Sequence, residues 1–227
     1  MAPMNPLGTR ERLIVTAERL FAERGIAAVS LREVNLAAGQ RNTSSAHYHF
    51  GSKEALVEAI LDLRQVELGE RRQRLYDELT ARETAPTVRD WVYVLVQPFV
   101  EFSARDSETR NFVPFLAHLF VQPPQNWQVL TSRSSGFAMH VALELNRELQ
   151  LPFILLRNRT LMILQHVVNA LATHMRASEY PSASGLPPLL PLEAFGVSLI
   201  DGVTAYMSAP VSPELAAILP PPIDEVS

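Results

Sequence analysis

The sequence predicts an all-α protein with a small N-terminal unit of three helices and a larger C-terminal helical domain. Apolar residues recur at helical spacing along most of the 227-residue chain, and no stretch alternates convincingly between apolar and polar residues. Prolines and glycines separate these helical stretches from one another. Residues 30–53 add a more specific pattern, that of two short helices joined by a tight glycine turn.

The first two helices are marked by apolar positions and by signals at their ends. A helix over residues 9–24 is stopped by Gly25 and carries an apolar stripe made of Leu13, Ile14, Ala17, Leu20 and Phe21. The second helix begins with a capping box, in which Ser30 accepts from the backbone N–H of Glu33 while the Glu33 carboxylate reaches back to Ser30. Gly39 ends this helix, because glycine readily takes the left-handed turn.

The third helix, which leads to Phe50, is short and begins with small polar residues. Such residues let a helix approach the major groove of DNA, where hydroxyl and imidazole groups bond to base edges or phosphates. Residues at the starts of the second and fourth helices are expected to meet phosphates, because free N–H groups and positive charge favour anions there. The expected DNA contacts are Ser30, Arg32, Arg41, Asn42, Thr43, Ser44, Ser45, His47, Tyr48 and Lys53.

These residues resemble the DNA-binding domain of the TetR family of transcriptional regulators. The resemblance covers about residues 9–62 and rests on motifs in the family's order: the capping box, the turn glycine, the aromatic-His-Phe tail and the Ser52-Lys53 helix start. It implies that Tyr48 lies against the sugar-phosphate backbone. It also implies a homodimer assembled mainly by the last two long helices, with a ligand cavity in each C-terminal domain.

The chain departs from the family pattern in the turn before the third helix. Ten residues separate Gly39 from Phe50, where the family pattern has nine, so the turn is expected to be one residue longer. Gln40 stands where the family has an apolar residue, and His47 aligns with the family's aromatic residue. The register of the base contacts is therefore open, and an alternative is a protein of the same fold that has lost operator binding.

The charge distribution favours a DNA-binding N-terminal domain, although the whole chain has a net charge of −4. Residues 1–53 hold seven basic and four acidic residues, a net charge of +3, which leaves −7 for the remainder. A basic unit on an acidic body fits a DNA-binding head joined to a partner domain, although ordinary scatter of charges would also produce +3.

Helical stretches separated by breaks continue through the C-terminal domain. A long amphipathic helix from Ser52 to about Arg82 links the two domains, and Pro86 breaks the chain after it. Further helices are predicted over residues 88–104, 108–121, 126–150 with a break near 134–136, 153–178 and 192–207. The predicted domains are residues 1–52, residues 53–209 and a Pro-rich tail of residues 210–227 that is expected to be irregular.

The C-terminal domain offers residues for a mostly apolar ligand pocket with a few polar anchors. The candidates are Phe99, Phe102, Phe115, His118, Trp127, Met139, His140, Met162 and His166, although each also fits plain core packing. Pro98 and Pro114 are expected to kink their helices, either as a bend around the core or as part of a cavity wall. A hydrophobic or amphipathic ligand is expected, and a lipid, an acyl thioester, a drug and an aromatic metabolite all remain open.

The last two long helices carry more apolar residues than one buried face requires. This excess indicates either a dimer interface, as the resemblance implies, or helices buried centrally in their own monomer. The candidate interface residues are Leu161, Leu164, Val168, Leu171, Phe195, Leu199 and Val203. A two-fold dimer would bring two recognition helices to DNA half-sites one or more helical turns apart.

Other classes of protein find no support in the sequence. The chain has no cysteine, and its histidines lack the close spacing of a metal site. No phosphate-binding glycine loop, metalloprotease motif or nucleophile elbow is present, so neither catalysis nor a cofactor is expected. No apolar run is long enough to span a bilayer, so a cytoplasmic protein without membrane contacts is expected. We therefore expect a ligand-responsive regulator that binds palindromic operator DNA, and a repressor because most members of the family are.

Overall fold

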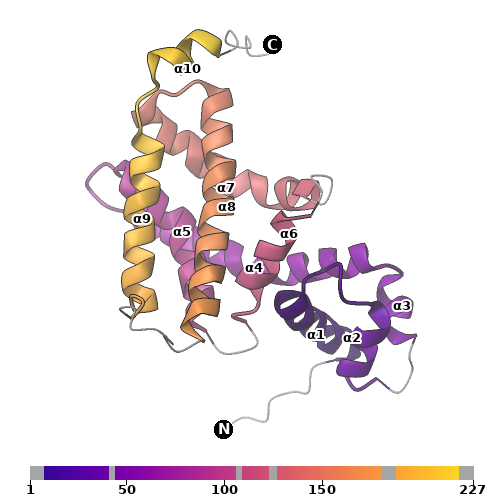
Figure 1. Ribbon diagram of the computed structural model, residues 1–227. Helices are drawn as coiled ribbons and strands as arrows, with labels where there is room; N and C mark the ends of the chain where they lie inside the picture. The colour runs from indigo at the N-terminus through magenta and orange to yellow at the C-terminus, as the bar shows by residue number, and fades with distance from the viewer. Residues whose placement is uncertain (1–7, 41–43, 106–108, 123–126, 180–187, 220–227) are drawn as a thin grey trace.

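The computed structural model describes residues 8–40, 44–105, 109–122, 127–179 and 188–219, with the backbone alone for residues 127–135. Within these ranges the chain forms ten α-helices and no strand, which confirms the predicted fold class (Figure 1). The helices are α1 (Thr9–Arg24), α2 (Leu31–Ala37), α3 (Ser45–Phe50), α4 (Lys53–Thr80), α5 (Val88–Ala104), α6 (Phe112–Phe120), α7 (Trp127–Leu149), α8 (Phe153–Ser178), α9 (Leu192–Ser208) and α10 (Pro213–Ile218).

The N-terminal head consists of α1, α2 and α3, which pack on one another and on α4 (Figure 1). Its core is built from apolar residues at helical spacing, including Phe21 of α1 and Leu56 and Ile60 of α4, all fully buried. Val34 and Ala46, also fully buried, bring α2 and α3 to the same core. Since α4 continues from the head into the body, one helix belongs to both parts of the molecule.

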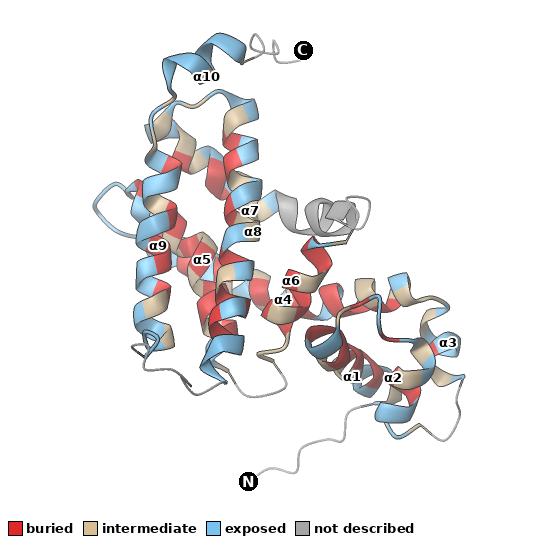
Figure 2. Ribbon diagram, in the orientation of Figure 1, coloured by how far each residue is buried: buried red, intermediate tan, exposed pale blue. Residues whose placement is uncertain are grey.

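The body is a bundle in which α5 packs against α7, α8 and α9, and α6 lies between α8 and α1 of the head. Buried residues follow the inner faces of these helices, whereas the outer faces of α8 and α9 are exposed (Figure 2). Gly196 allows α9 to approach α5 closely, because a Cβ at this position would lie only 2.7 Å from Cγ1 of Val100. Pro98 and Pro114 both lie inside continuous helices, α5 and α6.

Several predicted helix boundaries are confirmed, and two predictions are wrong. The helices α1, α5 and α8 begin and end at the predicted residues. The predicted break near residues 134–136 is wrong, because α7 runs through it. The tail after residue 210 is not wholly irregular, because α10 forms there. Its start combines two local signals, the Ser212 hydroxyl accepting from the N–H of Leu215 at 3.2 Å and a proline, Pro213, in the first turn.

Candidate nucleic-acid interface

A capping box fixes the start of α2 and engages the side chain of Ser30 within the head. The N–H and the hydroxyl of Ser30 each donate to the Glu33 carboxylate at 2.8 Å, and the hydroxyl accepts from the Glu33 N–H at 3.3 Å. Arg24 of α1 donates to the same carboxylate at 2.7 Å. These hydrogen bonds, the one from the Ser30 N–H first, lower the pKa of Glu33 to about 2.

Asn35 of α2 holds the start of α3, and sequence reasoning missed it. Its side chain is 1% exposed, and its Oδ1 accepts a hydrogen bond of 2.8 Å from the N–H of Ala46. The first N–H groups of a helix have no partner within the helix, so this bond satisfies one of them and fixes how α3 lies against α2. The signal in the sequence was an amide side chain directly after the apolar Val34, in the short helix before the turn glycine.

The outer side of the head presents α3 to solvent (Figure 2). The exposed residues among the expected DNA contacts are Ser30, Arg32, Ser44, His47 and Tyr48. Tyr48 is 84% exposed, and its ring meets the exposed ring of His49 edge to face, with 5.3 Å between the centroids. Ser45 is half-buried. Arg41, Asn42 and Thr43 lie outside the described residues. The arrangement is a short helix with an exposed face of hydroxyl, imidazole and phenol groups.

Lys53 has a structural role that differs from its predicted one. Its ammonium group donates to the backbone carbonyls of Ile26 at 2.9 Å, Ala27 at 3.3 Å and Val29 at 3.0 Å. A lysine ammonium has three donors, and here all three are used. Lys53 thus ties the connection between α1 and α2 to the start of α4, and its predicted phosphate contact stays a prediction.

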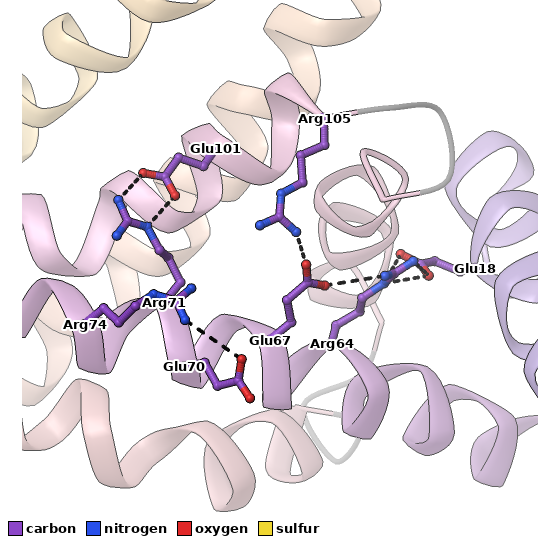
Figure 3. Close-up of polar contacts among 8 residues, drawn as sticks. All are labelled: Glu18, Arg64, Glu67, Glu70, Arg71, Arg74, Glu101 and Arg105. Atoms are coloured by element: carbon purple, nitrogen blue, oxygen red, sulfur yellow. Dashed lines mark hydrogen bonds and ion pairs between the residues drawn. The ribbon is translucent and has the colours of Figure 1, made fainter. Parts of the chain in front are cut away.

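A chain of charged side chains joins the head to the body (Figure 3). Glu18 of α1 is fully buried and accepts three hydrogen bonds of 2.8 to 3.1 Å from the guanidinium of Arg64 on α4. Arg64 lies 3.8 Å from Glu67, which pairs in turn with Arg105 at the end of α5. Burial raises the pKa of Glu18 to about 7, although the contacts with Arg64 oppose this shift.

A second contact between head and body brings α1 against α6. The rings of Phe21 and Phe115 stack with 6.3 Å between their centroids. Gly25, at the end of α1, faces His118, whose Nδ1 would lie 3.5 Å from a Cβ at the glycine. Desolvation lowers the pKa of His118. His118, expected in a ligand pocket, thus lies at the junction of the two parts.

The other candidate ligand residues do not gather around one cavity in the described part of the chain. Phe99, Phe102 and Phe115 are buried in the core, with at most 3% exposure. Met139 is half-buried, and the exposed His140 lies 3.0 Å from the hydroxyl of Tyr76. The remaining candidates are the exposed Met162 and His166, and Trp127, whose side chain lies outside the described residues.

A groove between the ends of α8 and α9 has a volume of about 420 Å³. Its lining residues are His166, Asn169, Ala170, Thr173, His174, Ala177, Leu189 and Phe195. His174 stacks on Phe195 with 4.2 Å between the ring centroids, and its Nε2 lies 2.8 Å from the carbonyl of Leu190. Only His166 among the predicted ligand residues lines this groove, together with Phe195 from the predicted dimer interface.

The candidate interface residues divide into buried and accessible ones. Those buried inside the monomer are Val168, Leu171, Leu199 and Val203, with at most 7% exposure. Leu164 and Phe195 are half-buried, and Leu161 is 38% exposed. The large apolar side chains exposed on the outer side of α8 and α9 also include Met162, Val197 and Tyr206. The accessible apolar surface therefore involves other residues than most of those predicted.

Two further properties bear on the function. Among the described residues, no group of three or more histidine, aspartate or glutamate side chains is arranged to hold a metal ion. Within the same part of the chain, each helix is too short or too polar to cross a membrane.

Comparison with known proteins identifies the head. Residues 13–60 match the family of bacterial regulatory proteins of the tetR type. The repressor KstR2 of Mycolicibacterium smegmatis is 37% identical over 59 residues, which are 26% of this chain and 28% of the relative. The KstR2 repressor of Rhodococcus jostii is 44% identical over 54 residues, 24% of this chain and 26% of the relative. The chain spans about a quarter of the length of these curated relatives. The family match covers most of the head and the first residues of α4.

Comparison with solved structures extends the similarity to the body. The fatty acid degradation regulator FadR of Bacillus halodurans covers 89% of this chain and 96% of its own, with a TM-score of 0.59 and 16% identity. The FadR of Bacillus subtilis, solved with stearoyl-CoA, covers 86% and 98%, with a TM-score of 0.60 and 14% identity. A TetR-family regulator from Rhodococcus sp. covers 88% and 99%, with a TM-score of 0.58 and 15% identity. At these identities the likeness is one of fold.

Proposed function

We propose that this chain is a transcriptional repressor of the TetR type that binds palindromic operator DNA as a homodimer and releases it when a small ligand binds. The observation that carries the proposal is the exposed polar face of α3, held rigidly by the bond between Asn35 and Ala46. A recognition helix must keep a fixed orientation, because base contacts depend on geometry. The matched relatives are named as repressors, which supports repression rather than activation.

The outer side of α8 and α9 supports the homodimer. Leu161, Met162, Val197 and Tyr206 leave a group of large apolar side chains exposed on two neighbouring helices. Contiguous exposed apolar surface on a folded protein is costly in water and typical of an interface. A second copy packed against this side by two-fold symmetry would carry two heads, one for each half of a palindrome.

The contacts between head and body support control by a ligand. The head is attached through Glu18 and Arg64 and through Phe21 and Phe115, so a movement of α4 or α6 changes the position of α3. A ligand that binds one arrangement of the body more tightly shifts the population of head positions. The released state is then one in which the spacing of the two heads does not fit the operator.

Selection of the purified full-length chain against a pool of random DNA duplexes, with sequencing of the bound fraction, tests operator binding. Enrichment of a palindrome with half-sites one or more helical turns apart is the expected result. No enrichment at low salt, with the protein folded and dimeric, would favour the alternative that this fold has lost operator binding, in line with the longer turn after Gly39.

A pair of matched variants tests whether the head makes the contact with DNA. Arg32→Ala, on the exposed start of α2, should weaken binding to all sequences and reduce the slope of log affinity against log salt by about 1. Arg147→Ala removes an exposed arginine from the body and should leave binding unchanged. Equal effects of the two variants would contradict an interface on α2 and α3. Tyr48→Ala should weaken binding while stability changes by less than about 0.5 kcal/mol.

A further inference from the structure

Arg72 on α4 is a buried cation whose side chain lacks an acidic partner. The residue is 4% exposed, and its Nε is enclosed without a hydrogen-bond partner. Burial lowers the pKa of Arg72 to about 10, and no neighbouring carboxylate opposes this shift. A buried polar group without a partner is rare in folded proteins and calls for an explanation, and a buried charge costs more than a neutral group.

Other arginines on the same helix differ from Arg72. Arg64, two turns earlier, is equally buried but makes three hydrogen bonds to the Glu18 carboxylate. Arg71, the next residue in the chain, donates to both oxygens of Glu101 at 2.7 and 2.8 Å. Figure 3 shows each guanidinium facing its carboxylate. Neighbouring helices therefore supply carboxylates to Arg64 and Arg71, whereas no carboxylate of the described residues pairs with Arg72.

Arg72 lies on an aromatic ring of α5, close along α4 to a cluster of aromatic side chains from α4, α5 and α7. Its guanidinium lies over the ring of Phe99 on α5, 5.1 Å from the ring centroid. One turn further along α4, the ring of Tyr76 contacts Trp91 of α5 and Phe137 of α7, at 5.6 and 6.0 Å between centroids. A buried cation on one aromatic ring, one helical turn from an aromatic cluster, matches a ligand with one acidic group and an apolar remainder.

We propose that Arg72 anchors the acidic group, a carboxylate or a phosphate, of an amphipathic effector whose apolar part packs among the aromatic residues of α4, α5 and α7. The inference rests on the proposed function, for which it names the class of ligand. An arginine binds either acid through two parallel N–H···O bonds, and the pairing removes the cost of the buried charge. Since Arg72 is only 4% exposed, a ligand that reaches its guanidinium must displace α4 or a helix packed against it.

A displacement of α4 by the ligand would link the ligand site to the head. Arg64 and Arg72 are eight residues apart on α4 and share its buried face, so a displacement of the helix at Arg72 also acts at the bond between Arg64 and Glu18. Ligand and operator would then favour different positions of the same helix, which is the condition for coupling between two sites.

Binding of three probes to the full-length chain, measured by calorimetry without DNA, tests the proposal. Dodecanoate and dodecyl phosphate carry the two candidate acids, and dodecanol carries the same alkyl chain without charge. We expect at least one acid to bind at least about tenfold more tightly than dodecanol, since a charged hydrogen bond contributes about 1.5–3 kcal/mol. Which acid binds more tightly distinguishes a carboxylate ligand from a phosphate ligand.

Two variants separate the anchor from a general effect on the fold. Arg72→Met should lose at least about tenfold in affinity for the acid, and Arg74→Met, on the exposed side of the same helix, should not. Without ligand, Arg72→Met should unfold at the same temperature as the natural chain or a higher one, because it removes an unpaired buried charge. Equal binding of acid and alcohol, absence of binding, or unchanged affinity in Arg72→Met would overturn the proposal. Because no DNA is present, none of these results depends on operator recognition.

Discussion

The head and the body of this protein are stabilised in different ways. In the head, specific polar groups fix the position of each short helix: Glu33 caps α2, Asn35 caps α3, and Lys53 holds the connection before α2. In the body, long helices pack through apolar and aromatic side chains, such as Phe102 and Phe112. A sequence-family match lies in residues 13–60, most of the head and the start of α4, whereas the likeness of nearly the whole chain to the FadR structures is one of fold, at 14% to 16% identity.

This difference follows from what each part has to do. A helix of six residues is too short to be stable by itself, so its orientation depends on hydrogen bonds that only particular side chains make. A bundle of long helices tolerates many apolar substitutions as long as volume and pattern are kept. The head is therefore expected to lose function with single polar substitutions, and the body to change its ligand specificity without losing its fold.

The largest effect is expected where the two parts meet, at Arg64. Arg64→Ala leaves the Glu18 carboxylate buried without its partner, which should lower the free energy of unfolding by about 3–5 kcal/mol. Urea titration followed by circular dichroism measures the loss. Arg74→Ala, which removes an exposed arginine from the same helix, serves as the control and should change stability by less than about 0.5 kcal/mol. Similar losses for both would show that the buried pair does not hold the junction.

The same pair should make stability depend on pH. Because the pKa of Glu18 is raised to about 7 in the folded state, its contribution is fully present below the unfolded pKa of about 4.5 and is lost as pH rises through about 7. Glu18→Gln, which is neutral at every pH, should flatten this decline. The test is the free energy of unfolding of the variant and of the natural chain, each measured between pH 5 and 8, and the difference between the two. An unchanged profile would mean that Glu18 stays ionised at neutral pH.

Within the head, Asn35→Ala should loosen α3. The buried N–H of Ala46 would lose its acceptor, at a cost of about 1–3 kcal/mol. Hydrogen exchange at the Ala46 amide should become faster and DNA binding weaker, while amides in α8 keep their protection. Leu36→Ala, on the same helix but 80% exposed, is the control. An unchanged exchange rate of the Ala46 amide in Asn35→Ala would show that Asn35 does not hold the start of α3.

The smallest effect distinguishes the two roles considered for Lys53. If it holds the connection before α2, Lys53→Met lowers the free energy of unfolding by about 1–2 kcal/mol even without DNA. If it contacts a phosphate, the substitution leaves stability unchanged and reduces the salt dependence of DNA binding. Chemical unfolding and a salt titration of DNA binding separate the two, and Arg32→Ala provides the phosphate-type reference.

The sequence by itself determined the helices and the kind of head. Periodic apolar residues, N-caps and turn glycines act over a few residues, so α1, α5 and α8 were predicted at their observed boundaries. The motifs of residues 30–53 indicated the family for the same reason. The short α10 was missed although Ser212 and Pro213 mark its start, because the prolines around it outweighed them.

Only the tertiary structure decided which distant groups meet. The carbonyls that bind Lys53 lie 24 to 27 residues away, and Glu18 lies 46 residues from Arg64. No local pattern specifies such partners, since they depend on how whole helices pack. Phe99 and His118 were both candidates for the ligand pocket. In the structure Phe99 lies under Arg72, whereas His118 faces Gly25 at the junction with the head. Whether a segment forms a helix is decided by residues close together in the sequence, whereas the partner of a buried charge depends on how the entire chain folds.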